Sequence, residues 1–186
     1  MLILASASPR RHELLMAAAI IHRVQPASVP EQRQPGESSD SFVLRLAQEK
    51  AHAVGCAPGD IVLAADTVVC LDGEMFGKPD SDNDARRMLA ALSGRDHWVK
   101  TGICILASER QRTAVQSTKV TFATLSEQEI HDYIRSGEHR DKAGAYGIQG
   151  RASRYVTSIE GCYHNVVGLP VALVYEYLKT LAPEQF

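Results

Sequence analysis

IVLAADTVV, residues 61–69, is an apolar run broken only by Asp66 and Thr67. Compact apolar runs of this kind are typical of a strand buried at the centre of a sheet. The run continues to Leu71 and meets Asp72-Gly73, a dipeptide that indicates a hairpin turn. We therefore expect a central strand followed by a hairpin.

Asp66 is the residue that does not fit this strand. A carboxylate buried without partners is costly, so Asp66 requires a cation, a metal or several hydrogen-bond donors. For this segment alone, an equally good interpretation is an aspartate that ends one strand at a turn and accepts from neighbouring N–H groups. Other oddly placed charges in the chain favour the functional interpretation.

Strands and helices alternate along the whole chain. We expect helices after Arg11, from Ser39–Ser41 to about Val54, after Ser81, at the Ser126–Glu129 capping box and at Pro170. We expect further strands at 2–5, 99–105, 118–122, 155–159 and 166–167, with a hairpin connection at 108–111. This order predicts an α/β fold with a mixed sheet, not a regular doubly wound one.

The bulk composition excludes several classes of protein. The 186 residues are 45% hydrophobic, with a net charge of −2 and one Trp, so nucleic acid is not an expected partner. Four widely spaced cysteines suggest neither a zinc site nor a disulfide framework. The apolar start at Met1–Ala5 is too short for a signal peptide, and no stretch has the length of a membrane span. We expect a cytoplasmic protein.

Arg10 and Arg11 lie in the first turn of an expected helix, where positive charge is unfavourable. Ser8 is an expected N-cap and Pro9 an expected first helical residue, so Arg10 and Arg11 fall at the positive end of the helix dipole. Free backbone N–H groups and two guanidinium groups together form a good phosphate receptor. The alternative is that both arginines point into water.

Two lysines are also unusual in position. Lys50 falls on the apolar stripe of the second expected helix, and Lys78 lies between Gly77 and Pro79, where the hairpin can return it towards Asp66. A single such lysine is more commonly a surface residue. Two of them suggest a shared negative ligand.

A glycine-rich loop spans Asp141–Gly150, in which Tyr146 and Gln149 offer a ring and an amide to a base edge. The loop is no P-loop. Glu31, in a proline-bounded loop, is a further candidate metal ligand. Because Mg²⁺ prefers one or two carboxylates plus phosphate oxygens, these residues favour a nucleoside triphosphate or a similar polyphosphate as ligand.

Several segments together resemble the Maf family of nucleotide pyrophosphatases. The resemblance rests on segments that occur in order from residue 2 to the last helix: Ser6-Ala7-Ser8-Pro9-Arg10-Arg11 with Glu13-Leu14-Leu15, Glu31, Glu49-Lys50-Ala51, Ala65-Asp66-Thr67-Val68-Val69, Gly77-Lys78-Pro79 and Asp141–Gly150. No matched motif departs from the family pattern.

The resemblance implies a Maf/inosine-triphosphatase-like fold: one domain over residues 1–186, with a strongly twisted mixed sheet, flanking helices and two lobes around a central cleft. It implies hydrolysis of a nucleoside triphosphate to the monophosphate and pyrophosphate. The Ala-Tyr-Gly-Ile-Gln-Gly form of the glycine loop, with Arg11 and Thr67, resembles the branch that acts on dTTP and UTP. The resemblance also suggests a homodimer.

By the same resemblance, Asp66 is the proton acceptor, and Arg11, Thr67 and Gln149 govern base choice. We expect Ser8, Arg10, Lys50 and Lys78 to bind the substrate, and Asp66 and Glu31 to bind a divalent metal, Mg²⁺ or Mn²⁺. Asp66 can instead be chiefly a metal ligand. Two rival functions stay open: a nucleotide-binding regulator of cell division without turnover, and a pyrophosphatase that removes modified nucleotides.

Overall fold

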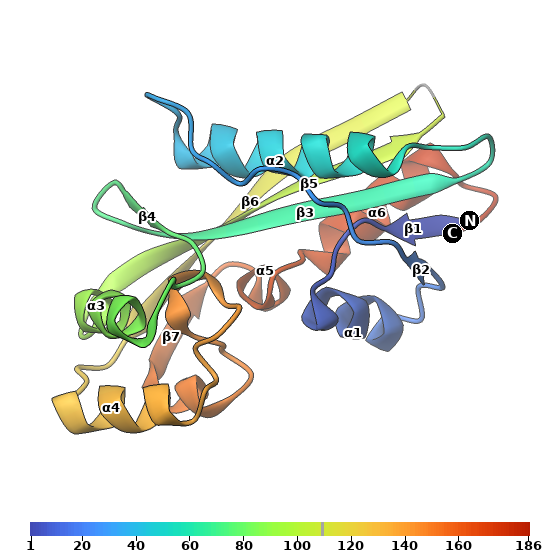
Figure 1. Cartoon of the computed structure of the whole chain (residues 1–186). Helices are drawn as coiled ribbons and strands as arrows, with labels where there is room; N and C mark the ends of the chain where they lie inside the picture. Colours follow the sequence, from blue (N-terminus) through green and yellow to red (C-terminus); the bar gives the residue numbers. More distant parts are fainter. Residues whose placement is uncertain (109) are drawn as a thin grey trace. The chain divides into compact units, whose positions relative to one another are not determined.

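The computed structural model describes residues 1–108 and 110–186 of the chain. Its elements, in chain order, are β1 (Leu2–Leu4), α1 (Pro9–Ala17), β2 (Arg23–Val24), α2 (Ser39–Val54), β3 (Ile61–Leu71), β4 (Glu74–Phe76), α3 (Asp82–Leu92), β5 (Asp96–Ala107), β6 (Arg110–Phe122), α4 (Glu127–Arg135), the 3-10 turns η1 (Ala143–Ala145) and η2 (Arg151–Tyr155), β7 (Val156–Glu160), α5 (Tyr163–Val167) and α6 (Val171–Leu181). They are labelled in Figure 1.

The strands of the described residues form one seven-stranded sheet in the order β2-β1-β3-β5-β6-β7, with β4 paired to β3. β1 runs parallel to both β2 and β3. The β3–β4 and β6–β7 pairs are antiparallel. The sheet is therefore mixed and the fold is α/β, as the order of the elements predicts.

The chain divides into two compact units. Unit 1 comprises Met1–Asp66, Thr101–Gln116 and Gly168–Phe186, and unit 2 comprises Thr67–Lys100 and Ser117–Val167. The long strands β3, β5 and β6 contribute residues to both. No helix within the described ranges combines the length and the apolar character needed to cross a bilayer.

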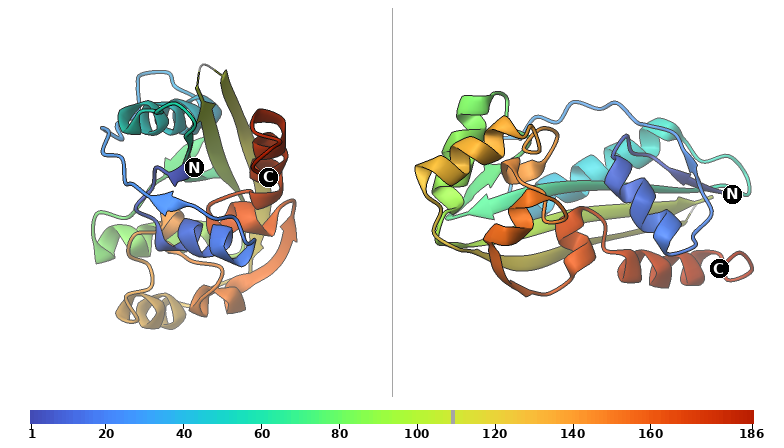
Figure 2. Two further views of the ribbon diagram at one scale, coloured as in Figure 1. Left: turned by 90° about the vertical axis from the view of Figure 1, so that its right-hand side faces the viewer. Right: turned by 90° about the horizontal axis from the view of Figure 1, so that it is seen from below.

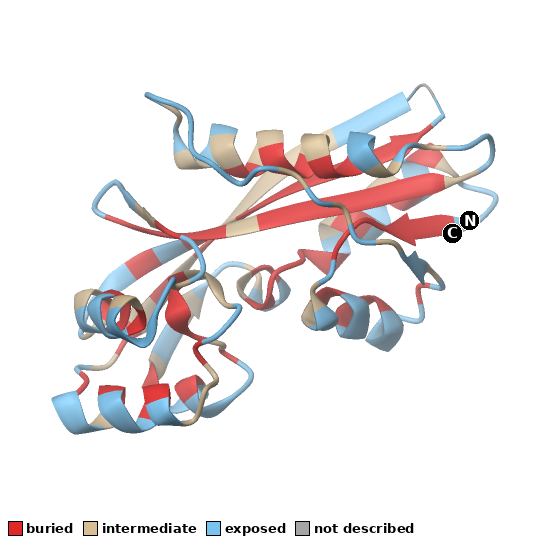
Figure 3. Ribbon diagram, viewed as in Figure 1, coloured by how far each residue is buried: buried red, intermediate tan, exposed pale blue. Residues whose placement is uncertain are grey.

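In unit 1, helices cover both faces of the strands. α2 and α6 lie on opposite sides of them in both turned views (Figure 2). On the α2 face, Ala47 and Ala51 of the helix pack in one buried cluster with Ile3 of β1, Val62 of β3 and Cys104 of β5. β3 is buried along its whole length except at Thr67, which is half-buried (Figure 3).

In unit 2, α3 lies beside α4 (Figure 1), and buried aromatic rings form part of the core. The Phe122 ring lies 4.7 Å from that of Tyr146, and the Tyr133 ring lies 5.9 Å from that of Tyr155. The capping box at Ser126 and Glu129 is present, as the sequence predicts.

One alternative interpretation and two expectations about local structure are wrong or shifted. β3 is one continuous strand through Asp66, so the aspartate does not end a strand at a turn. Val166–Val167 belongs to helix α5, not to a strand. Ser38, and not Ser39, Asp40 or Ser41 as the sequence suggests, caps α2 by accepting a hydrogen bond from the Ser41 N–H. The expected connection at 108–111 includes residue 109, which lies outside the described residues.

Candidate active site

The position of Asp66 follows from the alternation of side chains along β3. Val62 and Ala64 pack in the cluster that α2 covers. Since successive strand residues point to opposite faces, Asp66 shares this face with them. The carboxylate therefore lies on the face of the strand that α2 covers.

Lys50 of α2 provides the cation that a buried Asp66 requires. Both side chains are buried, each residue being 8% exposed. Lys50 Nζ lies 2.6 Å from Asp66 Oδ1 and also 2.6 Å from Glu31 Oε1. The Lys50 ammonium is thus paired with two carboxylates, that of Asp66 from β3 and that of Glu31 from the loop before α2.

The electrostatics of Asp66 reflect two opposed effects. Burial raises the pKa of the Asp66 carboxyl, and the charge of Lys50, followed by that of Arg11, opposes the rise. The burial effect is the larger, so the pKa stays above its ordinary value. An ionised Asp66 is consequently a stronger base than an exposed aspartate.

Arg11 connects the start of α1 to the same stretch of β3. Its Nη1 donates to the carbonyl oxygen of Ala65 (2.8 Å) and to Ser6 Oγ (3.0 Å), and its Nε donates to the carbonyl oxygen of Gly168 (2.8 Å). Arg11 is 8% exposed, and burial lowers the pKa of its guanidinium while the charge of Asp66 opposes this. Arg11 therefore fixes the backbone next to Asp66.

Ser8 and Pro9 take the helix-start positions that the sequence predicts, although the Ser8 side chain makes no capping hydrogen bond. Ser8 is the N-cap and Pro9 the first helical residue, and the first turn contains no acidic residue. The Ser8 N–H donates to Ser6 Oγ (3.2 Å). Ser8 and Arg10 are both half-buried. This first turn carries a positive charge at the positive end of the helix dipole.

The carboxylates of Glu31 and Asp66 fit the donor set of a hard divalent cation. Both present an oxygen to the position of the Lys50 ammonium, and Mg²⁺ is commonly held by one or two carboxylates together with substrate phosphates. Across the described part of the chain, no three His, Cys, Asp or Glu side chains gather into a complete metal centre. The two-carboxylate set requires further oxygens from a ligand.

The predicted residues Thr67, Lys78 and Gln149 belong to unit 2. Thr67 is half-buried, and Lys78 and Gln149 are exposed. The antiparallel pairing of Val69 with Phe76 directs the chain after β4 back along β3, so Lys78 returns towards Thr67.

The glycine loop is joined to the same part of unit 2. The Gly144 N–H donates to the carbonyl oxygen of Gly77 (3.0 Å). A Cβ at Gly144 would lie 2.8 Å from Val69 Cγ2, so the loop backbone lies directly against β3. The Gly77-Lys78-Pro79 segment and the Asp141–Gly150 loop are therefore in contact.

The structure thus places the site residues in two groups. One group, in unit 1, contains the helix start with Ser8, Arg10 and Arg11, together with Glu31, Lys50 and Asp66. The second group, in unit 2, contains Thr67, Lys78 and Gln149. Two residues that accept hydrogen bonds from Arg11, Ser6 and Gly168, were not predicted to belong to the first group. Ser6 could have been found, because it lies in the Ser6–Arg11 segment. Nothing in the sequence points to Gly168.

Comparisons with known proteins assign the chain to a family. A family model described as Maf-like protein matches residues 1–181. The chain belongs to the Maf family. This Maf chain is 51% identical over 179 residues to the dTTP/UTP pyrophosphatase of Koribacter versatilis, covering 96% of this chain and 93% of that relative. It is 49% identical over 180 residues to the dTTP/UTP pyrophosphatase of Yersinia pestis, with 96% and 91% covered.

Two solved structures share the fold of this Maf protein. The Ham1 protein of Staphylococcus aureus has a TM-score of 0.54 at 13% identity, covering 96% of this chain and 98% of that one. A HAM1 protein from Coxiella burnetii has a TM-score of 0.53 at 16% identity, with the same coverage. At these identities the likeness concerns the fold alone.

Proposed function

We propose that this Maf protein hydrolyses nucleoside triphosphates, with dTTP and UTP preferred, to the nucleoside monophosphate and pyrophosphate. The observation that carries the proposal is the Lys50 ammonium held between the carboxylates of Asp66 and Glu31. The relatives that are about half identical to this chain support it, because they are named dTTP/UTP pyrophosphatases.

In the proposed reaction, Asp66 directs a water molecule onto the α-phosphorus. The carboxylate accepts a proton as the water oxygen bonds to phosphorus, and the bond from the α-phosphorus to the bridging oxygen breaks. Pyrophosphate leaves with that bond's electron pair. The raised pKa of Asp66 supports this role, because a stronger base takes the proton more readily.

The phosphates require positive charge, since phosphoryl transfer depends largely on positioning and electrostatic stabilisation. We assign phosphate binding to Arg10, Lys50 and Lys78, with Ser8 at the N-terminus of α1. Glu31 and Asp66 would hold a divalent cation, Mg²⁺ or Mn²⁺. When bound, this cation draws negative charge from the triphosphate.

We assign base choice to Arg11, Thr67 and Gln149. Gln149 is exposed on the glycine loop, and its amide offers both an acceptor and donors to the imide edge that uracil and thymine share. Replacing Gln149 by Glu removes the donors and keeps the length of the side chain. The ratio of kcat/KM values among dTTP, UTP and CTP changes in this variant if the assignment is right.

We propose that residues 1–186 act as one Maf-like domain, that the protein is a cytoplasmic homodimer, and that it has no nucleic-acid partner. The family match over residues 1–181 supports the single domain, and the net charge of −2 supports the absence of nucleic acid. The homodimer is proposed from the resemblance alone. Light scattering on the purified chain measures the oligomeric state.

A screen of all common nucleoside triphosphates with and without Mg²⁺ tests the main proposal. The products of each reaction are identified as monophosphate plus pyrophosphate or as diphosphate plus phosphate. We expect the first pair, dependent on the metal and largest for dTTP and UTP. Binding of triphosphate without release of pyrophosphate would instead identify a regulator, and stronger turnover of modified pyrimidine nucleotides would identify a different substrate class.

A further inference from the structure

The loop that carries Glu31 is exposed, yet it delivers a carboxylate to a buried lysine. Residues 31–36 are all exposed, and the Glu31 side chain itself is 47% exposed. An exposed segment of this kind has few buried contacts to fix it. The 2.6 Å approach of Glu31 Oε1 to Lys50 Nζ therefore needs a restraint from elsewhere in unit 1.

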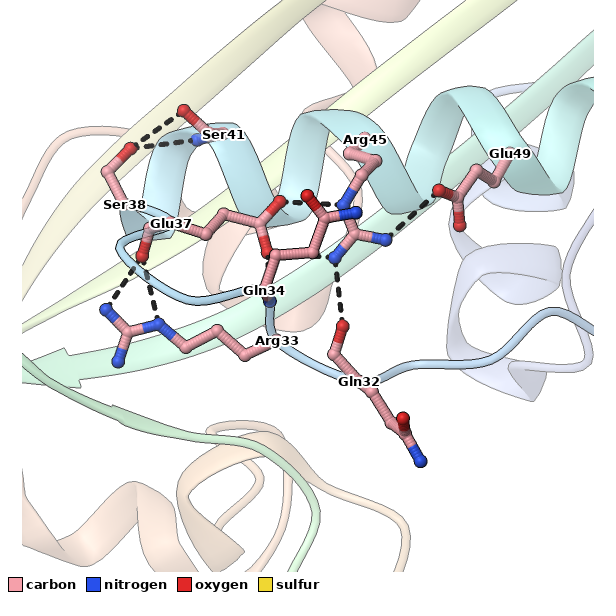
Figure 4. Close-up of polar contacts among 8 residues, drawn as sticks. All are labelled: Gln32, Arg33, Gln34, Glu37, Ser38, Ser41, Arg45 and Glu49. Atoms are coloured by element: carbon pink, nitrogen blue, oxygen red, sulfur yellow. Dashed lines mark hydrogen bonds and ion pairs between the residues drawn. The ribbon is translucent and has the colours of Figure 1, made fainter.

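Arg45 of α2 supplies that restraint (Figure 4). Its Nε lies 2.7 Å from Glu37 Oε1 and its Nη2 lies 2.8 Å from Glu37 Oε2, which makes a bidentate pair. Nη2 also donates to the carbonyl oxygen of Gln32 (3.0 Å), and Nη1 donates to Glu49 Oε1 (3.1 Å). One guanidinium thus ties both ends of the loop to the helix that carries Lys50.

Glu37 extends the same network into the loop. Its Oε2 accepts from the Gln34 N–H (3.0 Å), and its carbonyl oxygen accepts from Arg33 Nε (2.9 Å) and Nη2 (2.7 Å). The Glu37 side chain is only 7% exposed. The hydrogen bonds from Arg45 lower the pKa of Glu37 to about 2, so the pair stays charged throughout the neutral range.

We propose that Arg45 and Glu37, the Arg45–Glu37 clasp, are positioning residues that hold the Glu31 carboxylate beside Asp66 and thereby set the affinity for the divalent cation. The inference rests on the proposed function, which assigns the metal to Glu31 and Asp66. Gln32, which the clasp holds through its carbonyl, directly follows Glu31. Partners of this kind, which orient a metal ligand without touching the metal, typically change affinity about 10- to 100-fold when removed.

Arg45→Lys and Glu37→Gln test the proposal, with Arg23→Lys as the matched control. Lysine keeps the charge of Arg45 but cannot form the bidentate pair. Arg23 also belongs to unit 1 and meets a carboxylate, with Nη2 3.8 Å from Asp60 Oδ2, but it has no part in the loop. The readouts are binding of Mn²⁺ alone by electron paramagnetic resonance, amide hydrogen exchange over residues 31–37 and the thermal midpoint.

We expect both clasp variants to exchange faster over residues 31–37 and to bind Mn²⁺ about tenfold more weakly. Their thermal midpoints fall below that of Arg23→Lys, because they lose hydrogen bonds of a nearly buried pair, so Mn²⁺ binding is measured at a temperature at which every variant is folded. In turnover, the Mg²⁺ concentration for half-maximal activity rises while kcat at saturating Mg²⁺ changes little. Because the two variants break the same Arg45–Glu37 pair, the double variant loses less Mn²⁺ affinity than the sum of the two single losses.

Glu31→Gln separates failure of this inference from failure of the proposed function. If Glu31→Gln weakens Mn²⁺ binding but the clasp variants bind as the wild type does, the clasp is overturned and the metal assignment stands. If Glu31→Gln itself binds Mn²⁺ normally, the assignment of Glu31 fails and the inference fails with it.

Discussion

Gly102 of β5 lies so close to Val43 of α2 that a Cβ on the glycine would fall 2.5 Å from the Val43 carbonyl carbon. Real Cβ atoms essentially never approach backbone this closely. Only glycine at this position lets α2 lie directly on the sheet. The same helix carries Lys50, so the contact holds close to the sheet the helix that brings the ammonium to Asp66.

Gly102→Ala therefore displaces α2 or strains its backbone. Overpacking of this kind costs about 1–3 kcal/mol of unfolding free energy. Urea denaturation measures the loss, and Gly77→Ala is the control because a Cβ there meets nothing within 4 Å. Equal stability of the two variants would contradict the described contact.

Removing one member of the Lys50–Asp66 pair leaves a buried charge without its partner. Lys50→Met is expected to cost about 3 kcal/mol of unfolding free energy. The double variant Lys50→Met with Asp66→Asn costs less than Lys50→Met alone, since the uncompensated carboxylate is gone. Chemical denaturation of the two single variants and the double variant gives the coupling free energy. Strict additivity would show that the two side chains do not interact.

The buried His97 is expected to make the free energy of unfolding depend on pH. The residue is 1% exposed, with its Nε2 2.8 Å from the Tyr146 hydroxyl, and burial lowers its pKa from 6.5 to about 4. Between these values the unfolded chain binds a proton that the folded chain does not, so stability is full above pH 6.5 and is lost as the pH falls to about 4. The shift corresponds to about 3 kcal/mol at most.

Urea denaturation across this pH window measures the effect. His97→Gln and His97→Phe cannot take up the proton, so their stability changes less with pH than that of the wild type. Both variants lower stability at neutral pH, but only the difference in pH dependence tests the prediction. A wild-type slope that survives both substitutions would assign the effect to another group.

Substitutions at two neighbouring residues of the glycine loop, Gly144 and Ala145, are expected to change stability in opposite directions. Gly144 has a φ of 67°, and a Cβ there would meet Val69, so Gly144→Ala strains the backbone and moves the loop from β3. Ala145 has a φ of 61°, so Ala145→Gly relieves strain of about 1–2 kcal/mol and is neutral or stabilising. Thermal midpoints and KM for dTTP measure both. If Gly144→Ala is as stable as the wild type with an unchanged KM, the loop does not depend on this contact.

The parts of the site that the sequence predicted depend on local rules. Helix-start signals place Ser8 and Pro9, and 3.6-residue spacing places Lys50 on the buried face of α2. The cost of a buried charge predicted that Asp66 has a cation, a metal or several hydrogen-bond donors beside it, and Lys50 is such a cation.

What the sequence could not predict depends on contacts between distant residues. The Gly168 carbonyl that accepts from Arg11 comes from a segment 157 residues away. The charge of Asp66 within the continuous strand β3 is offset by Lys50, a residue of another element 16 positions earlier in the chain. Val166–Val167 has a strand-like pair of β-branched residues, but tertiary context makes it helical.

Attack of water on the α-phosphorus is tested most directly by finding which product receives the oxygen atom of the water. The reaction of dTTP is run in isotopically labelled water, and mass spectrometry locates the label in dTMP or in pyrophosphate. We predict that the label enters the phosphate of dTMP, and that Asp66→Asn slows its incorporation about 100-fold or more. Label in pyrophosphate or in free phosphate would contradict attack on the α-phosphorus. An Asp66→Asn variant as fast as the wild type would contradict the role of Asp66 in directing the water.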